Sequence, residues 1–472
     1  MKIESVKYSA VKNSVWRFDP SFHLSEAVYV HQLLEKSPYK MSKVDCCSDR
    51  VFLGNIFSRN FVKDKEYGVP YLAASDTVLS DINTGAFLSK RQANELSYLM
   101  LEKDWILVTC SGTVGNVTYT NKCFENHIAT HDLIRIVPND KIVKRGCVYA
   151  YLSSKFGHCL LTQSEFGGVV KHVNDEYVRN VPIPQFPAKF QEKVDNLIKE
   201  SARLREEAND IQKAAMQILY SKTGLNEVSI DEYNYFGPSV EKRAVSSFVI
   251  NKKLVTPVTI NAFNLSLRNR NLIKRIKRTI ETKPLIDCLD ENGLFSTGSF
   301  PRIELNPGHG VMLINQKDIF DTIIKGKYIS KRNVRLDRLV EQNEIMIAGV
   351  GTLAETESFC RCIYANEYLK GKLVSGEFIR MKTNQSVMSG YLYLWLSSDY
   401  GFRLIRSTQA GTKLCRPIPK LLEQIPVPII KRDLMKKIND MVLDSQNKLY
   451  QSVMKEIDAI SLVEKEIDGW KA

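Results

Sequence analysis

The chain of 472 residues repeats one order of features in its two halves, and this duplication limits the folds that it can adopt. The closest correspondence lies near the end of each half, where four features recur at one offset of 244 residues. They are Leu152-Ser-Ser154, Gly157, Gly167 and Val181-Pro-Ile-Pro184 in the first half, and Leu396-Ser-Ser398, Gly401, Gly411 and Ile425-Pro-Val-Pro428 in the second. A register that is kept over this whole stretch indicates two copies of one folded unit.

The match continues upstream with small shifts of register. Phe87-Leu-Ser-Lys-Arg91 faces Tyr328-Ile-Ser-Lys-Arg332, and two short apolar runs, Trp105-Ile-Leu-Val108 and Ile345-Met-Ile347, each lead into a glycine turn. Short apolar runs bounded by turns predict strands. The changing offsets indicate loops of different length, and such differences concentrate where loops face a partner.

After each Pro-x-Pro element the apolar period changes from that of a strand to that of a helix. The first helix, from 188 to about 221, would be roughly 50 Å long at about 1.5 Å per residue. Stripes of this length favour packing of the two helices on each other. The residues expected at the seam are Val194, Leu197, Leu204 and Ile211 in the first helix and Ile438, Met441, Leu449 and Ile457 in the second. The alternative is that each helix packs only on its own globular domain.

Composition places the chain among ordinary globular proteins, with 44% hydrophobic and 25% charged residues. A formal charge of +13 favours a polyanionic partner, although a basic surface can also serve solubility alone. The 10 cysteines show no zinc-ligand spacing and fit buried thiols in a reducing cytosol. The start of the sequence has no signal peptide, and apolar runs such as 390–396 are too short to span a bilayer, so we expect a cytoplasmic protein.

The duplicated order of motifs resembles the specificity subunit of type I restriction-modification systems over essentially the whole chain. The matching motifs of the first copy are Arg17-Phe-Asp-Pro-Ser-Phe22, the Gly112-Thr-Val-Gly115 turn, the Gly167 loop and Val181-Pro-Ile-Pro184. The second copy departs from them at Thr259-Ile-Asn-Ala-Phe263, which lacks the aspartate, and at Ala354, which occupies a glycine position.

The resemblance implies an α+β protein in which two similar α/β target recognition domains alternate with two long helices that pair as an antiparallel coiled coil. The expected boundaries are 1–187 and 225–429 for the recognition domains, and 188–224 and 430–472 for the helical regions. Antiparallel pairing would place the two domains at opposite ends of a rod.

Motifs for catalysis are missing from the sequence. Methyl transfer to an exocyclic amine would need a glycine-rich cofactor loop and an Asn/Asp-Pro-Pro-aromatic motif, and a translocase would need a phosphate loop ending in Gly-Lys-Ser/Thr. Carboxylate pairs such as Asp45 with Asp49 are expected to be solvated turns and caps, and His131-Asp132 a base contact, a phosphate contact or plain surface. We therefore expect a non-catalytic DNA-recognition subunit without catalytic residues, metal or cofactor of its own.

Each recognition domain would read one half of a divided, asymmetric DNA site, with Lys and Arg on phosphates and Arg, Asn or Gln on bases. We expect the candidates to lie in turns. They are Lys63, Lys65, Lys90, Arg91, Thr113, Asn116, Lys171 and His172 in the first copy, and Lys325, Lys327, Lys331, Arg332, Arg335, Arg406, Lys413 and Arg416 in the second. A basic run from Arg268 to Arg278 could also follow a phosphate backbone, or be the solvent face of an amphipathic helix that packs Leu272, Ile273, Ile276 and Ile280 inward.

The resemblance further implies partners that act on the DNA. These are two methyltransferase subunits, which would bind S-adenosylmethionine, and ATP-dependent restriction translocase subunits, which would use ATP and Mg. Three alternatives stay open from the sequence. They are the specificity subunit of a related type II-like system, a stand-alone DNA-acting enzyme, and a coiled-coil scaffold that joins other proteins.

Overall fold

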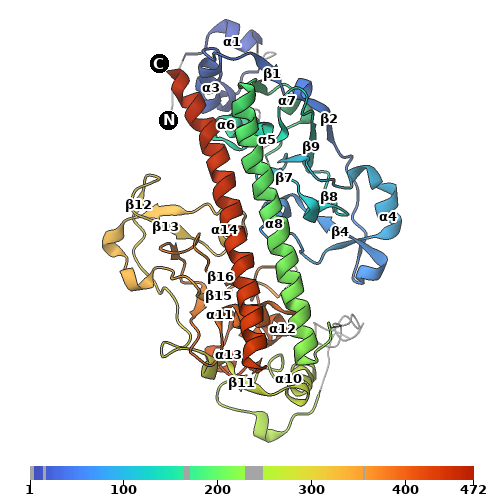
Figure 1. Cartoon of the computed structure of the whole chain (residues 1–472), viewed down its shortest axis with the longest axis vertical. Helices are drawn as coiled ribbons and strands as arrows, with labels where there is room; N and C mark the ends of the chain where they lie inside the picture. Colours follow the sequence, from blue (N-terminus) through green and yellow to red (C-terminus); the bar gives the residue numbers. More distant parts are fainter. Residues whose placement is uncertain (1–4, 14–16, 164–170, 229–247, 354–356, 472) are drawn as a thin grey trace. The chain divides into compact units, whose positions relative to one another are not determined.

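The computed structural model describes residues 5–13, 17–163, 171–228, 248–353 and 357–471 (Figure 1). Gly167 and Ala354 of the motif comparison lie outside the described residues. The chain forms two compact units of mixed helix and sheet. The first unit contains 1–206 with 451–472, and the second contains 207–450.

The first unit is built on two four-stranded sheets. One has the strand order β2-β9-β6-β7 and is antiparallel, and the other has the order β3-β5-β4-β8, in which β4 and β8 are parallel. The strands are β1 Met41–Lys43, β2 Ser48–Leu53, β3 Phe61–Val62, β4 Gly68–Leu72, β5 Phe87–Ser89, β6 Ile106–Thr109, β7 Val117–Tyr119, β8 Ile128–Ala129, β9 Leu133–Pro138 and β10 Pro182–Pro184. The helices are α1 Tyr8–Asn13, α2 Pro20–His23, α3 Glu26–Leu34, α4 Lys90–Glu95, α5 Arg145–Ser153, α6 Lys155–Gln163 and α7 Asp175–Arg179.

Strand β6, expected from its apolar run, is buried on both faces. Ile106 and Val108 point into one hydrophobic cluster, with α5 and α6, whereas Leu107 points into a second cluster with Trp105 and Phe124. Successive side chains of a strand face opposite sides of the sheet, so one short strand supplies two cores. This explains why its sequence is continuously apolar rather than alternating.

The second unit contains a three-stranded antiparallel sheet, β16-β15-β18, and a four-stranded sheet, β12-β14-β13-β17, in which β13 and β17 are parallel. The strands are β11 Thr282–Pro284, β12 Glu304–Leu305, β13 Val311–Ile314, β14 Lys327–Ile329, β15 Ile345–Ala348, β16 Cys362–Tyr364, β17 Leu373–Val374, β18 Phe378–Met381, β19 Gln409–Ala410, β20 Arg416–Pro417 and β21 Pro426–Pro428. The helices are α10 Leu267–Thr279, α11 Ser389–Ser397, α12 Asp399–Ser407 and α13 Pro419–Leu422.

The Leu-Ser-Ser and glycine positions that recur in the sequence form one helix-to-helix corner. Ser154 ends α5 and its hydroxyl accepts a hydrogen bond from the backbone N–H of Gly157, at 3.2 Å, so that it caps the start of α6. A Cβ on Gly157 would lie 2.2 Å from the carbonyl oxygen of Tyr151. In the second unit, Ser398 caps Gly401 at 3.1 Å between α11 and α12, and a Cβ on Gly401 would lie 2.2 Å from the oxygen of Trp395. The serine is thus needed in both units as a helix cap, and the glycine is needed because the backbones approach closely.

The Pro-x-Pro elements are short strands. In the first unit β10 pairs antiparallel with β1, with Ile183 opposite Ser42, and in the second unit β21 pairs with β11, with Val427 opposite Lys283. Ile183 and Val427 are both fully buried. Each pair leads directly into a long helix, and prolines are tolerated there because these two-stranded ribbons need few N–H donors.

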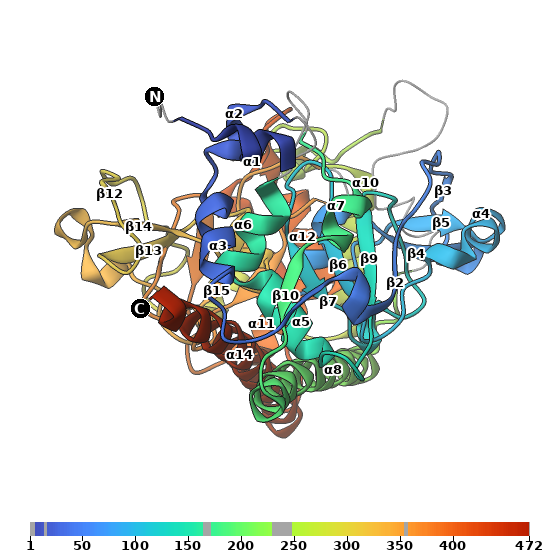
Figure 2. The ribbon, with the colours of Figure 1, turned by 90° about the horizontal axis from the view of Figure 1, so that it is seen from above.

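Helix α3 covers α6 in the first unit, as Figure 2 shows. Its buried face consists of Ala27, Val30, Leu33 and Leu34. A hydrogen bond of 2.9 Å between His31 Nε2 and Gln163 Oε1 fixes the contact at its exposed edge. The corresponding place in the second unit is taken by α10, which packs on α12 through Leu272 and Ile276.

The two long helices are α8, Ala188–Thr223, and α14, Arg432–Asp468, and each passes through both units. In the first unit the hydroxyls of Ser201 and Ser452 lie 3.1 Å apart. In the second unit the hydroxyl of Ser445 donates to the carbonyl of Ala208 at 2.9 Å. Both units therefore contain direct contact between the two helices (Figure 1).

The residues expected at the helix seam divide into two groups. Val194, Leu204 and Ile438 are buried, whereas the remaining five are half-buried, namely Leu197, Ile211, Met441, Leu449 and Ile457. Val194 belongs to the core of the first unit and Ile438 to that of the second. The helices therefore pack on globular cores as well as on each other.

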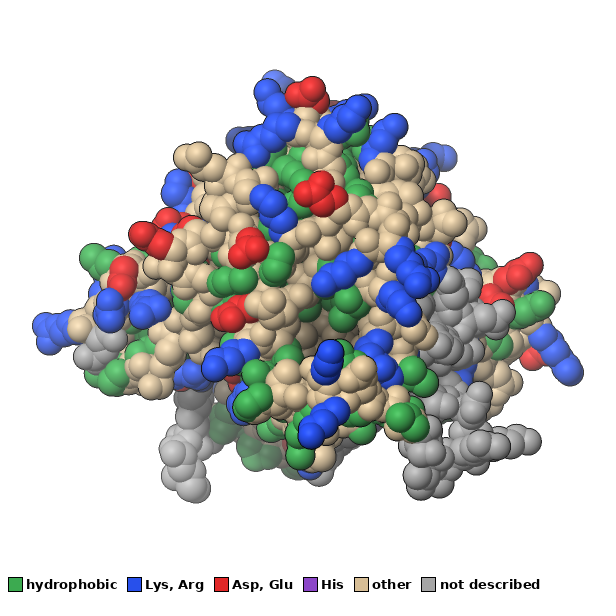
Figure 3. Space-filling view, turned by 90° about the horizontal axis from the view of Figure 1, so that it is seen from below, with side chains coloured by type: hydrophobic (Ala, Val, Ile, Leu, Met, Phe, Trp, Pro, Cys, Tyr) green, Lys and Arg blue, Asp and Glu red, His purple; other side chains and the backbone are tan. Residues whose placement is uncertain are grey.

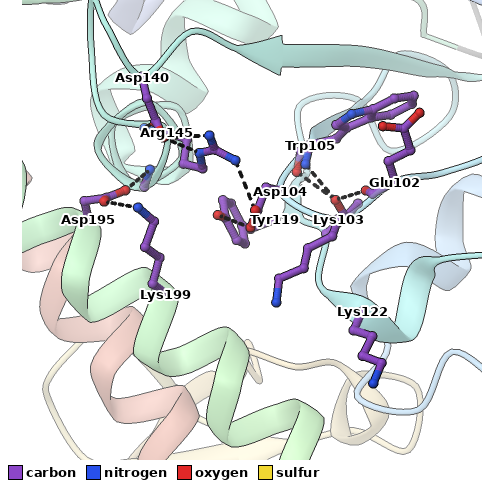
Figure 4. A network of polar contacts seen from close by, with 12 residues as sticks. Glu102, Lys103, Asp104, Trp105, Tyr119, Lys122, Asp140, Arg145, Asp195 and Lys199 are labelled. Carbon is purple, nitrogen blue, oxygen red and sulfur yellow. Dashed lines mark hydrogen bonds and ion pairs between the residues drawn. The ribbon is translucent and has the colours of Figure 1, made fainter.

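Charged and polar side chains join the sheet of the first unit to its helices (Figure 4). Arg145, at the start of α5, lies 3.0 Å from Asp104 and 2.6 Å from Asp140, and the hydroxyl of Tyr119 donates to Asp104 at 2.7 Å. Asp104 has a φ of 69°, which places its carboxylate at a turn before β6. These contacts connect the turn before β6 to strand β7 and to the start of α5.

No helix in the described ranges is long and apolar enough to cross a bilayer. Within the same ranges no three His, Cys, Asp or Glu side chains converge as they would around a metal ion.

Candidate nucleic-acid interface

A tight turn follows β6 in the first unit. Gly112 and Gly115 have φ of 74° and 83°, in the region that favours glycine, and the hydroxyl of Thr109 donates to the carbonyl of Thr113 at 2.6 Å. The hydroxyl of Thr109 also accepts from the N–H of Asn116 at 3.0 Å. One side chain therefore holds both ends of the turn and leaves Thr113 exposed at its tip.

The segment after α6 pairs with this turn. The N–H of Gly112 donates to the carbonyl of Lys171 at 3.0 Å, and Ser111 forms an antiparallel bridge with His172. Lys171 is exposed and His172 is half-buried. The structure thus brings four of the predicted residues to one edge of the unit: Thr113, Asn116, Lys171 and His172.

A third segment reaches the same edge at the start of β9. The N–H of Cys110 donates to the carbonyl of Asp132 at 3.1 Å. Behind it, the buried guanidinium of Arg135 donates to the carbonyls of Ala129, Thr130 and Leu133. Burial lowers the pKa of Arg135 to about 10, and burial raises the pKa of the Cys110 thiol to about 12. Both groups keep their ordinary charge at neutral pH. The hydrogen bonds from Arg135 stabilise the backbone of the segment between β8 and β9.

Another predicted group lies around the β3–β5 pair. Lys63 and Lys65 follow β3, and Lys90 and Arg91 follow β5. Because the two strands are antiparallel, with Val62 opposite Phe87, these two pairs of residues lie at opposite ends of the strand pair. All four side chains are exposed. Lys90 and Arg91 were expected in a turn, but they begin helix α4, whose first turn is capped by the hydroxyl of Ser89.

In the second unit the turn after β15 meets the β19–β20 hairpin. Gly351 and Cys415 exchange two backbone hydrogen bonds, at 3.2 and 2.7 Å. This pairing brings the predicted residues Lys413 and Arg416, both exposed, to the 349–352 turn. The first unit has the same arrangement, because the turn after β6 pairs there with the segment that follows α6.

The remaining basic candidates of the second unit surround β14, and all five are exposed: Lys325, Lys327, Lys331, Arg332 and Arg335. Lys327 forms an ion pair with Glu304 at 2.6 Å, and Arg335 forms one with Asp337 at 2.6 Å. Exposed pairs of this kind are weak, so phosphates could displace these carboxylates.

Arg406 does not lie in a surface turn, as the sequence had suggested. It is 5% exposed within α12, and its guanidinium lies 4.7 Å from the ring centroid of Phe402. The helical period of α12 turns this position inward, toward the apolar ring. Arg406 is therefore part of the packing of the second unit rather than of its surface.

The basic run 268–278 forms helix α10. Of the four residues that the amphipathic alternative places inward, Leu272 and Ile276 are buried and Ile273 and Ile280 are half-buried. The basic side chains of Lys274, Lys277 and Arg278 are exposed. Figure 3 shows the face of the molecule on which this helix lies, where blue basic side chains outnumber red acidic ones. Asn264, just before the helix, donates to the carbonyls of Ser407 and Gln409, which links α10 to the β19–β20 hairpin.

Sequence reasoning missed Arg59 and Arg302. Each stands two residues before the edge strand of a four-stranded sheet, Arg59 before β3 and Arg302 before β12. Arg59 donates to Thr130 at 3.2 Å, and the guanidinium of Arg302 lies 5.7 Å from the ring of Phe300. Their shared position before matching strands was the signal available in the sequence.

Hydroxyl and basic side chains that are exposed on turns above a sheet can contact the phosphates and bases of a nucleic acid. Residues 51–205 match the family model of the type I restriction modification DNA specificity domain. These residues, about a third of the chain, are similar to that DNA specificity domain, in agreement with the resemblance seen in the sequence.

Three solved structures are similar to the chain. A type I restriction-modification S subunit from M. genitalium has 12% identity and a TM-score of 0.34, with 92% of this chain and 96% of that one covered. A structure of the assembly of the type I R-M system has 12% identity and a TM-score of 0.27, covering 92% and 96%. An HsdS subunit from Thermoanaerobacter tengcongensis has 13% identity and a TM-score of 0.27, covering 92% and 97%. No curated protein matches the chain in sequence.

Proposed function

We propose that the two units are two target recognition domains and that each reads one half of a bipartite DNA site. The observation that carries this proposal is the shared construction of the two edges. In the first unit the turn after β6 pairs with the segment after α6, through Ser111 and His172. In the second unit the turn after β15 pairs with the segment after α12, through Gly351 and Cys415. Different side chains on these turns, such as Thr113 and Lys171 against Lys413 and Arg416, favour two different half-sites.

The long helices would set the spacer between the half-sites. Contacts between α8 and α14 in both units support pairing as an antiparallel coiled coil. Buried serines at 201, 445 and 452 support close approach of the two backbones. The length of the helices, rather than any base contact, would then determine the number of unspecified bases.

The chemistry would reside on partner subunits. Two methyltransferase subunits would dock on the helical regions 188–224 and 430–472 and bind S-adenosylmethionine, and ATP-dependent translocase subunits would use ATP and Mg for cleavage. This chain would supply no catalytic residue. His131 and Asp132 fit a role at the DNA surface, since they lie on the edge that carries Thr113 and Lys171.

The test is expression of the chain with its methyltransferase partner, followed by mapping of the methylated adenines. A bipartite, asymmetric motif with an unspecified spacer is expected. A continuous palindrome contradicts the division into two readers, and methylation by the chain alone contradicts the assignment of catalysis to partners.

A domain exchange provides the matched control. Replacing residues 1–187 with the first domain of another such subunit should change one half of the motif and leave the other half and the spacer intact.

Removal of a full helical turn from 190–220 should shorten the spacer or abolish assembly, without changing the bases read in either half.

A further inference from the structure

The guanidinium of Arg59 makes three contacts, two with the loop between β8 and β9 and one with an aromatic ring of β4. Its Nη2 donates to the hydroxyl of Thr130 at 3.2 Å and lies 3.6 Å from Asp132 Oδ2, and its guanidinium carbon lies 5.8 Å from the ring centroid of Tyr71. Thr130 is itself 1% exposed and donates to the same carboxylate at 3.1 Å. Arg59 is therefore anchored on the buried hydroxyl of Thr130, which is itself hydrogen-bonded to Asp132.

This anchored group lies on the candidate interface. The carbonyl of Asp132 accepts the N–H of Cys110, which directly precedes the turn bearing Thr113, and the next backbone pair joins Gly112 to Lys171. The side chain of Arg59 remains 39% exposed. Its guanidinium can consequently meet a DNA groove while one nitrogen stays bound to Thr130.

The turn that carries the anchor is rigid. Arg135 donates three hydrogen bonds to the carbonyls of 129, 130 and 133 from below, and Asp132 is flanked by His131, whose Nε2 lies 3.5 Å from Asp132 Oδ1. The ring of His131 packs edge to face on Phe57, with centroids 5.7 Å apart. Ordering that is already present in the free protein lowers the entropy lost on binding.

We infer that Arg59 reads a guanine in the half-site bound by the first unit, and that Asp132 is the residue that positions it. A planar guanidinium with fixed orientation matches the O6 and N7 acceptors that guanine presents in the major groove. A phosphate contact would also suit the planar guanidinium, but it would not depend on the base, so loss of discrimination at a single position separates the two roles. The inference rests on the proposed function of the first unit as the reader of one half-site.

The second unit differs at the matching place, which supports a role in specificity. Glu377 accepts the N–H of Gly349 through its carbonyl at 3.1 Å, as Asp132 does for Cys110. Arg302, however, lies over Phe300 rather than over a carboxylate. Residues that only hold the fold would be expected to match in both units.

The test compares Arg59→Lys and Arg59→Ala with the native chain in complex with its methyltransferase partner. Both variants should lose discrimination at one G·C position of one half-site, by roughly 10- to 100-fold, with the other positions unchanged. Asp132→Asn should weaken discrimination at that same position. Lys63→Ala, an exposed lysine near the same sheet, is the control and should reduce affinity equally for all sequences.

A substitution in the DNA keeps the test independent of folding. Replacing single guanines of the motif by 7-deazaguanine, which lacks the N7 acceptor, should weaken binding of the native complex at one guanine of the first half-site, and should have no further effect on Arg59→Ala. Full discrimination by Arg59→Ala, or insensitivity to every 7-deazaguanine in that half, overturns the inference. A motif without two halves would instead contradict the proposed function, while the loss at a single guanine could still be measured.

Discussion

The carboxylate of Asp195 in α8 accepts a hydrogen bond of 2.8 Å from the backbone N–H of Gly146 at the start of α5. The long helix therefore caps a helix of its globular unit. In the second unit Asn439 of α14 accepts the N–H of Gly390 at 3.0 Å, at the start of α11. A Cβ at Gly146 would lie 2.8 Å from the Cα of Asp195, so the glycine lets the two helices approach.

Asp195→Ala is expected to lower the stability of the first unit by about 1–2 kcal/mol, because a buried N–H loses its acceptor. Asp195 is 3% exposed, so the N–H that it caps has little access to bulk water. Thermal or denaturant unfolding measures the loss. Lys199→Ala removes only the 2.7 Å ion pair of the exposed Lys199 with Asp195 and should have a much smaller effect. Equal losses in the two variants would argue against the cap as the source.

Gly157→Ala and Gly401→Ala should each strongly destabilise the unit that contains them. The added Cβ would lie 2.2 Å from a backbone oxygen, so the α5–α6 or α11–α12 corner must open, at a cost of more than about 2 kcal/mol. Expression level and melting temperature are the measurements. Gly469→Ala, where nothing lies within 4 Å of the new Cβ, is the matched control and should behave as the native chain.

The corner motif was visible in the sequence because its cause is local. Ser154 and Gly157 must be three residues apart for the serine to cap the helix, and the same spacing holds for Ser398 and Gly401. The long helices were visible for a similar reason, since their apolar period continues over many turns. Their bounds, Ala188–Thr223 and Arg432–Asp468, follow that period closely.

The interface could be predicted only in part, because it depends on which distant segments meet. The local sequence predicts Thr113 and Lys171 as turn residues, but nothing local indicates that Gly112 pairs with Lys171. Arg59 was missed because its partners, Thr130 and Asp132, are far away in the sequence. Arg406 was misplaced because a basic residue in a short helix looks exposed until the packing on Phe402 is known.

Asp321, next to the exposed Lys325 region, should make the second unit more stable at mildly acid pH. Burial, and then the nearby Asp318, raise the pKa of Asp321 from 3.8 to about 6. A folded-state pKa above that of the unfolded chain means that the folded unit binds the proton more tightly, so stability falls as pH rises from about 4 to 6 and stays lower above that. Asp321→Asn should therefore stabilise the unit at pH 7.5 by about 1 kcal/mol, allowing for solvent around a half-buried group.

The check on Asp321 is a pair of unfolding curves for the native chain and Asp321→Asn at pH 4.5 and pH 7.5. The difference between the two proteins should be larger at pH 7.5, where native Asp321 is ionised, than at pH 4.5, where it is largely neutral. A difference that does not change with pH would show that the carboxylate is better solvated than its surroundings indicate.

Helix α10 should contribute to DNA affinity through phosphates and not to the choice of sequence. Lys274, Lys277 and Arg278 are exposed on a helix whose 13 residues include no acidic one, and α3, at the matching place in the first unit, contains no Lys or Arg. The fold therefore does not require these charges. Each phosphate contact contributes about 0.9 to the slope of log affinity against log salt concentration.

Replacing Lys274, Lys277 and Arg278 together by Gln should reduce that slope by about 2 to 3 and weaken binding to every sequence by the same factor, with the methylated motif unchanged. Titrations of the methyltransferase complex on specific and unrelated DNA over a range of salt concentrations provide the measurement. Replacement of three exposed lysines elsewhere, Lys36, Lys141 and Lys370, lowers the net charge equally and is the control. An equal change of slope in both variants would assign the effect to net charge, whereas a loss that α10 alone produces assigns it to this helix as a surface that follows the DNA backbone.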